Sequence, residues 1–321
     1  MTAYRLAHVT DPHFRSPDLK ALLDGARLHD FMGKRAVGAL NVVVNRRRKH
    51  KMELLEALGE DLRREHPEHL ALTGDLSNVS LEAEWRAALR WIEGTGRAPA
   101  DVTVIPGNHD AYVPDVVVRG TFQALFGTYQ SPDVEPPSAA GAAAEAAAAP
   151  AGDGQAMYPF VRLRGPLALV GLNSCVPTGD LGAWGRVGAP QLERLEAALG
   201  RRELQGKVRV VLIHHPPVRL KGGEERNLKD RAALAAVLER AGADLIVHGH
   251  DHRDESANLT GPGGDAIPVI GAGSASYAGG PEKRARYNVY EFEGTRITRM
   301  TRVHDEASDQ FRESARVVLR A

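Results

Sequence analysis

Short apolar runs alternate with helical patterns along most of the chain. The runs are partly β-branched, which is typical of strands that are buried on both faces. They cover residues 6–10, 70–73, 102–105, 167–172, 208–213 and 245–247. Between the runs, leucines recur at helical spacing, as in Leu54, Leu55, Leu58 and Leu62, which would share one helix face. This alternation predicts an α/β fold.

The last third of the chain has a different pattern. Residues 267–270, 287–292 and 296–303 are apolar or alternating runs with only short connections. Such spacing favours successive antiparallel strands over strands linked by helices. We therefore expect the chain to end in an antiparallel extension of the sheet structure.

Composition and charge narrow the class of protein. The chain has 321 residues, of which 43% are hydrophobic, enough for one large domain or two small ones. The formal net charge is zero, so the chain as a whole attracts neither nucleic acid nor an acidic membrane. Cys175 is the only cysteine, which excludes an intramolecular disulfide and fits a reducing compartment. No run reaches the roughly 20 apolar residues of a membrane span, and we expect a cytoplasmic protein.

Two segments stand apart from this alternation and are expected to be surface insertions. Residues 130–156 are rich in Ala, Pro and Gly, and we assign them no chemistry. In residues 15–51, an apolar stretch at 37–44 lies between basic residues at 34–35 and 46–51. The stretch from 34 to 51 would cap a cleft or rest on the inner face of an anionic membrane. The alternative is a partly buried helix with a solvated charged end.

Five motifs rich in Asp, His and Asn each follow a predicted strand. They are Asp11-Pro12-His13, Gly74-Asp75, Gly107-Asn108-His109-Asp110, His214-His215-Pro216-Pro217 and Gly249-His250-Asp251-His252. Carboxylate and amide oxygens combined with imidazole nitrogens, without thiolate, suit Mn, Fe or Zn. Two ions side by side need a bridging group, and Asp75 follows a strand and a glycine that would let it reach both. Residues two apart on an extended segment point the same way, so Asp11 with His13, and His250 with His252, would face one ion.

This ordered set of motifs resembles the calcineurin-like metallophosphoesterase superfamily, in its phosphodiesterase branch. The resemblance covers about residues 4–255 and implies a four-layer αββα sandwich with two mixed sheets, formed as a single domain over residues 1–321. It implies two divalent or mixed-valence ions (Mn, Fe or Zn), the first held by Asp11, His13, Asp75 and His252. The second would be held by Asp75, Asn108, His214 and His250. The choice of His214 over His215 rests on its position two residues before a proline, and it stays open at this point.

The resemblance also implies a reaction. A hydroxide between the two ions would attack a phosphodiester or pyrophosphate bond. His109 would contact the scissile phosphate or protonate the leaving group, with Asp110 orienting it. The His-His-Pro-Pro and Gly-His-Asp-His motifs resemble those of cyclic-nucleotide phosphodiesterases. The basic insertion resembles that of the enzymes that cleave UDP-2,3-diacylglucosamine, a lipid-linked nucleotide.

Two other functions share these motifs. A DNA nuclease of the repair type would need a basic face, which the neutral charge argues against. A non-catalytic scaffold would not need a complete set of ligands or His109. A small-molecule or lipid-nucleotide phosphoester is therefore the expected substrate, and nucleic acid is not expected to bind.

Overall fold

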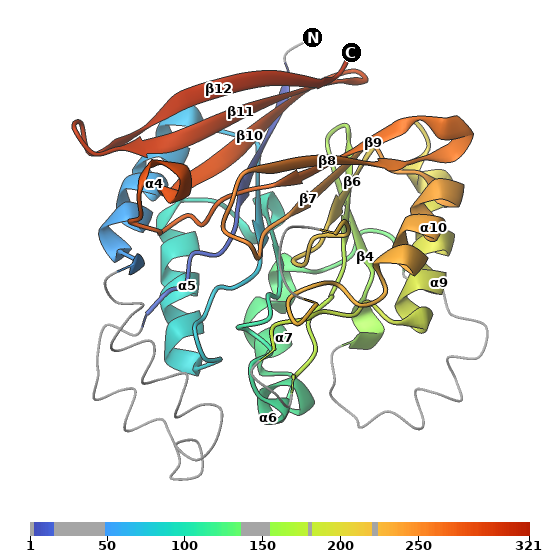
Figure 1. Ribbon diagram of the computed structural model, residues 1–321, viewed down its shortest axis with the longest axis horizontal. Helices are drawn as coiled ribbons and strands as arrows, with labels where there is room; N and C mark the ends of the chain where they lie inside the picture. The colour runs from blue at the N-terminus through green and yellow to red at the C-terminus, as the bar shows by residue number, and fades with distance from the viewer. Residues whose placement is uncertain (1–2, 16–48, 136–154, 179–181, 220–223) are drawn as a thin grey trace.

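The computed structural model describes residues 3–15, 49–135, 155–178, 182–219 and 224–321, which form two six-stranded sheets packed face to face (Figure 1). Helices cover the outer face of each sheet, so that the layers follow the order helix, sheet, sheet, helix. Each sheet contains both parallel and antiparallel pairs. The expected αββα sandwich with two mixed sheets is confirmed.

The first sheet has the strand order β12-β11-β10-β1-β2-β3. The first three strands along the chain are parallel, and the last three join them antiparallel. The strands are β1 (Tyr4–Val9), β2 (His69–Thr73), β3 (Val102–Ile105), β10 (Arg286–Glu293), β11 (Arg296–Asp305) and β12 (Gln310–Arg320). The helices on this side are α4 (Met52–Glu65), α5 (Glu82–Gly94), α6 (Pro114–Val118) and α7 (Thr121–Phe126).

The second sheet has the strand order β4-β5-β6-β7-β9-β8, with α9 (Ala189–Leu199) and α10 (Arg231–Ala241) on its outer face. Its strands are β4 (Phe160–Arg164), β5 (Leu167–Gly171), β6 (Val208–Leu212), β7 (Leu245–His248), β8 (Glu255–Thr260) and β9 (Ala266–Gly271). Short 3-10 helices lie in the connections of both halves: η3 (Pro99–Asp101), η4 (Gly127–Tyr129), η5 (Gln155–Met157), η6 (Arg202–Leu204), η7 (Pro262–Gly264) and η8 (Pro281–Lys283).

Successive side chains of the central strands point to opposite faces of the sheet and contribute to different hydrophobic cores, of which the described residues form three. In β2, Leu70 and Leu72 pack with the helices, whereas Ala71 faces the second sheet. In β6, Val211 packs with the helices on its own side, and Val210 lies between the sheets. A strand covered on both faces must be apolar at every position, which explains the continuous apolar runs in the sequence.

Three strands were not predicted, and all three lie at the edge of a sheet. β4, β8 and β12 each have only one neighbouring strand. β8 alternates between exposed and half-buried residues, and most of β12 is exposed, so neither forms an apolar run.

The expected course of the last third was partly wrong. Residues 287–292 and 296–303 do form an antiparallel pair, as β10 and β11. Residues 267–270 do not continue that series, because β9 pairs parallel with β7 and antiparallel with β8 in the second sheet. The chain then returns to the first sheet, where β10 pairs with β1.

Most of the two expected insertions, residues 16–48 and 136–154, lies outside the described residues, so their roles stay predictions. Among the helices that are described, none combines the length and the apolar content needed to cross a bilayer.

Candidate metal centre

The parallel strands of both sheets deliver the motif residues to one end of the molecule. Asp11 and His13 follow β1, Asp75 follows β2 and Asn108 follows β3. From the second sheet, His214 follows β6, and the pair His250 and His252 follows β7. Carboxyl ends of parallel strands meet at the same edge of a sheet, so residues far apart in sequence converge there.

The backbone of these loops is strained where the site is built. Five of the motif residues have positive φ angles: Asp11 (51°), His13 (48°), Asp75 (53°), His250 (78°) and His252 (54°). Each such residue costs on the order of 1–3 kcal/mol, and residues of this kind gather at functional sites. The expected extended geometry of the Asp11-His13 and His250-His252 pairs is therefore wrong, although both pairs reach the site. Left-handed turns, not strand alternation, aim them there.

Two glycines of the motifs are required by close packing of these loops. A Cβ on Gly107 would lie 2.1 Å from the backbone nitrogen of Asp75. A Cβ on Gly249 would lie 1.9 Å from Thr10 Oγ1 and 2.4 Å from Asp11 Oδ2. Because neither glycine has a side chain, the loop after β3 can pack against Asp75 and the loop after β7 can pack against Asp11. This close packing brings the metal-donor residues of these loops together.

The first group of donor atoms comes from Asp11, His13, Asp75 and His252, each of which offers one atom within 4.8 Å of the others. His252 Nε2 lies 3.1 Å from Asp11 Oδ1 and 3.2 Å from His13 Nε2. His13 Nε2 lies 3.8 Å from Asp75 Oδ2. Donors about 2.1 Å from a shared ion stand roughly 3.0–3.4 Å apart at angles between 90° and 110°, and roughly 3.8 Å apart at about 130°, so all three distances can be met around one metal.

The second group consists of Asp75, Asn108, His214 and His250. Asn108 Oδ1 lies 3.1 Å from His214 Nε2 and 2.9 Å from His250 Nδ1. His214 Nε2 also lies 3.4 Å from Asp75 Oδ1. These distances match the spacing expected of donors around a second ion.

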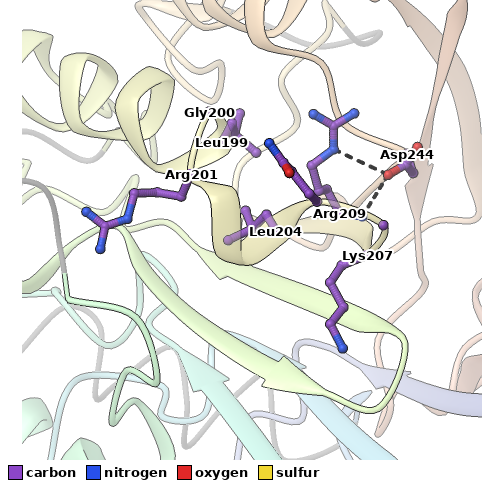
Figure 2. Close-up of a pocket in the computed structure, with 9 residues that line it drawn as sticks. Leu199, Gly200, Arg201, Leu204, Lys207, Arg209 and Asp244 are labelled. Atoms are coloured by element: carbon purple, nitrogen blue, oxygen red, sulfur yellow. Dashed lines mark hydrogen bonds and ion pairs between the residues drawn. The ribbon is translucent and has the colours of Figure 1, made fainter.

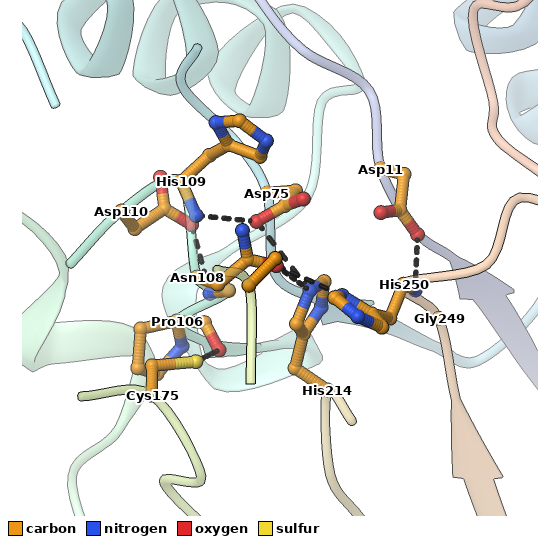
Figure 3. A network of polar contacts seen from close by, with 12 residues as sticks. Asp11, Asp75, Pro106, Asn108, His109, Asp110, Cys175, His214, Gly249 and His250 are labelled. Carbon is orange, nitrogen blue, oxygen red and sulfur yellow. Dashed lines mark hydrogen bonds and ion pairs between the residues drawn. The ribbon is translucent and has the colours of Figure 1, made fainter. Parts of the chain in front are cut away.

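Asp75 belongs to both groups through different oxygens. Its Oδ2 faces His13 of the first group, and its Oδ1 faces His214 of the second. Figure 3 shows Asp75 between the backbone nitrogen of His109 and the ring of His214, with Asp11 on its other side. A carboxylate with one oxygen toward each group has the geometry of a bridging ligand.

Backbone carbonyls fix which ring nitrogen of His214 and of His250 faces the centre. His214 Nδ1 donates to the Thr73 carbonyl (2.7 Å), and His250 Nε2 donates to the Arg226 carbonyl (3.0 Å). In the neutral rings, the nitrogens that face Asn108 Oδ1 therefore carry lone pairs. Acceptors that face one another repel unless a cation lies between them, so this donor set fits a metal.

Burial keeps these donors in the form that binds metal. It lowers the pKa of His214, and it lowers the pKa of His250 well below the usual range, so both rings are neutral near pH 7. Burial opposes ionisation of Asp11, but the charge attraction and hydrogen bonds from His252, His214 and Thr10 together outweigh that effect and lower the pKa of this carboxyl below its usual range. Deprotonated carboxylates and neutral imidazoles are the forms that coordinate metals.

His214 and His215 occupy different places. His215 Nδ1 is hydrogen-bonded to Ser174 Oγ (2.8 Å), and its Nε2 donates to the Ala183 carbonyl (3.1 Å). Its ring nitrogens therefore hold loops of the second sheet, whereas His214 Nε2 faces Asn108 and Asp75. Of the two rings, that of His214 is the one that faces the second donor group.

His109 lies beside the two groups. Its backbone nitrogen donates to Asp75 Oδ1 (2.8 Å), and its ring Nδ1 donates to the Asn78 carbonyl (2.6 Å). The ring stacks on Tyr112 with centroids 5.6 Å apart. This arrangement holds the imidazole beside the donor groups.

The role expected for Asp110 needs correction. Its carboxylate accepts hydrogen bonds from the backbone nitrogens of Gly107, Leu76 and Ser77, from Ser77 Oγ and from Trp85 Nε1, at 2.8–3.1 Å. The contact that orients the His109 ring comes instead from Asn78. Asp110 thus ties the loop that carries Asp75 to the loop that carries Asn108 and His109.

One residue at the centre was missed in the sequence. His50 is buried, and one of its ring nitrogens lies within 4.8 Å of ligand nitrogens of His13 and His252. In the sequence it stands in the basic run at residues 46–51, for which we expected only electrostatic contacts with a substrate or a membrane. No motif marks it, because His13, whose ring it approaches in space, is far away along the chain.

Cys175 and a surface hollow are not part of the centre. Cys175 is buried, and its Sγ donates to the Pro106 carbonyl (Figure 3). The hollow, of about 330 Å³, is lined by residues that include Arg201, Lys207, Arg209 and Asp244 (Figure 2). Lys207 and Arg209 stand at the start of β6, whereas His214 follows its end, so the hollow lies at the opposite edge of the sheet.

We predict that Asp110→Ala lowers the free energy of unfolding of the metal-free protein by about 2–4 kcal/mol, because several buried donors lose their acceptor. Urea unfolding measures this. The exposed Asp265 is a control, and Asp265→Ala should change stability by no more than about 0.5 kcal/mol. Equal stabilities for the two variants would contradict the role given to Asp110.

Comparison with known proteins shows the family and the fold of the chain. The family model for calcineurin-like phosphoesterases matches residues 4–254. No curated protein matches the chain in a sequence search. Among solved structures, a dimetal phosphatase from Danio rerio has a TM-score of 0.59 at 12% identity, over 100% of this chain and 99% of that one.

Two further structures share the fold. A purple acid phosphatase from yellow lupin (Lupinus luteus) seeds has a TM-score of 0.57 at 12% identity, over 97% of this chain and 53% of that one. GAP50, the anchor in the inner membrane complex of Plasmodium, has a TM-score of 0.51 at 11% identity, over 100% of this chain and 89% of that one. At such identities these likenesses show the fold alone. The match of the family model over most of its length shows that the chain belongs to the calcineurin-like phosphoesterase family.

Proposed function

We propose that the protein is a two-metal hydrolase of phosphodiester or pyrophosphate bonds. The observation that carries the proposal is the position of Asp75, which presents one carboxylate oxygen to each of two donor groups. Two ions held there would activate a water molecule and neutralise the phosphate oxygens. The mixed oxygen and nitrogen donors favour Mn, Fe or Zn.

The chain's own residues have distinct parts in this reaction. Asp11 and Asp75 supply the negative charge that holds cations in a buried site. His109 holds a proton on Nδ1 for the Asn78 carbonyl, so its Nε2 would contact the phosphate. When the ring is protonated, Nε2 would donate its proton to the leaving alkoxide. Asp110 is a positioning residue, which keeps the loops of Asp75 and Asn108 together.

For the substrate, we propose a cyclic nucleotide or a lipid-linked nucleotide such as UDP-2,3-diacylglucosamine. The described end of the basic segment supports this class, because Lys49 and Lys51 are exposed on either side of the buried His50 at the centre. Cations beside the metal groups would attract the phosphates of a nucleotide. The same proposal places the protein in the cytoplasm, with residues 34–51 meeting the inner membrane face if the substrate is a lipid.

The test is hydrolysis of UDP-2,3-diacylglucosamine, cyclic AMP and bis(p-nitrophenyl) phosphate with Mn²⁺ added. Asp75→Asn removes the bridging charge and should lower turnover by at least about 10²–10³-fold, the loss typical for removal of one electrostatic stabiliser. Asp265→Asn is the matched control on the exposed surface. Turnover by Asp75→Asn at the wild-type rate would refute the mechanism, and absence of turnover in the wild type on all three esters would refute the substrate class.

His109→Ala should separate proton transfer from metal binding. We expect the variant to keep both ions, as measured by elemental analysis, and kcat to fall by about 10²–10⁴-fold. His66→Ala, at the end of α4, serves as a control and should leave both quantities unchanged. Loss of metal from His109→Ala would mean that this residue is a ligand, not a proton donor.

A further inference from the structure

His50 reaches the metal centre from outside the five motifs. It stands two residues before α4, at the end of the segment 15–51, and only 3% of its surface is exposed. The segment up to residue 48 lies outside the described residues, but His50 itself and the residues after it are described. A histidine buried beside a set of metal donors calls for a chemical explanation.

The backbone holds His50 firmly in this place. Lys51 N donates to the Ser276 carbonyl (3.0 Å), and Ala278 N donates to the Lys49 carbonyl (2.6 Å). His50 thereby pairs with Tyr277 as in an antiparallel bridge, and their rings lie 5.3 Å apart, edge to face. The loop that receives it also touches the first donor group, because Ser274 Oγ donates to the Asp11 carbonyl (2.7 Å).

The ring of His50 points toward the first donor group. Its centroid lies 4.6 Å from that of His13 and 5.6 Å from that of His252, while His13 and His252 are 5.1 Å apart. With metal–nitrogen bonds of about 2.1 Å, imidazoles on one ion have centroids roughly 4.5–5.6 Å apart. One nitrogen of each of the three rings lies within 4.8 Å of the other two. Three rings in this arrangement can face one ion.

A hydrogen bond at the second nitrogen of the His50 ring also supports a role in metal binding. His50 Nδ1 is hydrogen-bonded to Ser276 Oγ at 2.8 Å, so Nε2 is the atom that would reach the ion. Histidines that bind metals usually have their second nitrogen held in this way by an oxygen. His13 is held likewise, through its Nδ1 and the Ser77 carbonyl.

We propose that His50 is an additional nitrogen ligand of the first metal position. The inference rests on the proposed two-metal function and adds a ligand from the basic segment to it. His50 groups with His13 and His252 but does not lie within 4.8 Å of both carboxylates as well, so to share their ion its ring would move toward Asp11 and Asp75 when the metal binds. A third imidazole strengthens the preference of this position for Zn, Fe or Mn over Mg, which favours oxygen donors.

The first test measures metal binding, not activity. Metal-free wild type, His50→Ala and His66→Ala are titrated with Zn²⁺ by calorimetry, and retained zinc is counted after dialysis. We expect His50→Ala to bind one of its two ions at least 10- to 100-fold more weakly, the range seen even for loss of outer partners of ligands. His66→Ala removes a histidine at the end of α4, outside both donor groups, and should match the wild type. Two ions bound by His50→Ala at wild-type affinity would overturn the proposal.

The second test uses the unaltered chain and does not depend on the folding of a variant. The protein has 13 histidines, and their ring nitrogens can be labelled with ¹⁵N and followed as Zn²⁺ is added. We expect the ring signals of five histidines to shift, namely those of His13, His50, His214, His250 and His252. A shift of the other four alone would overturn the assignment of His50.

The two proposals can fail separately. Five shifted histidines without hydrolysis of any ester would leave His50 as a ligand and refute the enzymatic function. Hydrolysis with only four shifted histidines would keep the function and refute the inference about His50.

Discussion

The shared carboxylate of Asp75 is the contact on which the rest of the centre depends. It is 2% exposed, and it faces imidazole nitrogens of both donor groups. A second carboxylate, that of Asp11, is buried nearby, and burial keeps His214 and His250 neutral. Two buried negative charges among neutral rings are unfavourable without cations. The loops around these two carboxylates therefore form a site whose negative charge is balanced when metal cations bind.

The backbone of the metal-donor loops is strained, and contacts with the surrounding structure offset the cost of this strain. Positive φ angles at five motif residues would cost several kcal/mol in total, a large part of the stability of an ordinary domain. The loops after β1 and β2 remain paired through backbone bonds from Asp11 N to the Gly74 carbonyl and from His13 N to the Asp75 carbonyl. Asp110 then fastens the loop after β3 to the loop after β2. The rigid sheets behind these loops therefore determine where the donor atoms lie.

The buried strands and the metal-donor residues could be predicted from the sequence. Strands covered on both faces leave continuous apolar runs, so β1, β2, β3, β5, β6 and β7 could be predicted, β3 among them although it lies at the edge of its sheet. Edge strands such as β8 and β12 are not covered in this way and were missed. The donor residues were found because each follows a strand in a short motif. The left-handed backbone at Asp11 and His13 could not be found, since aspartate and histidine also adopt ordinary conformations.

At Asp110 and His50 the structure differs from the sequence-based prediction because of tertiary contacts. Asp110 was expected to hold His109, but its position in the turn brings it to the backbone of Leu76 and Ser77 instead. His50 joins the centre only because the loop at residues 274–278 binds its backbone and ring. Neither contact has a signature in sequence spacing. Both become evident once the loops of the two sheets are seen together.

The central claim is that one carboxylate joins two metal ions, and it can be tested most directly by anomalous diffraction from crystals of the Mn²⁺-loaded protein. The account predicts two peaks about 3.5–4 Å apart, with Asp75 Oδ2 bound to one and Oδ1 to the other. A single ion, or two ions of which only one touches Asp75, would contradict it.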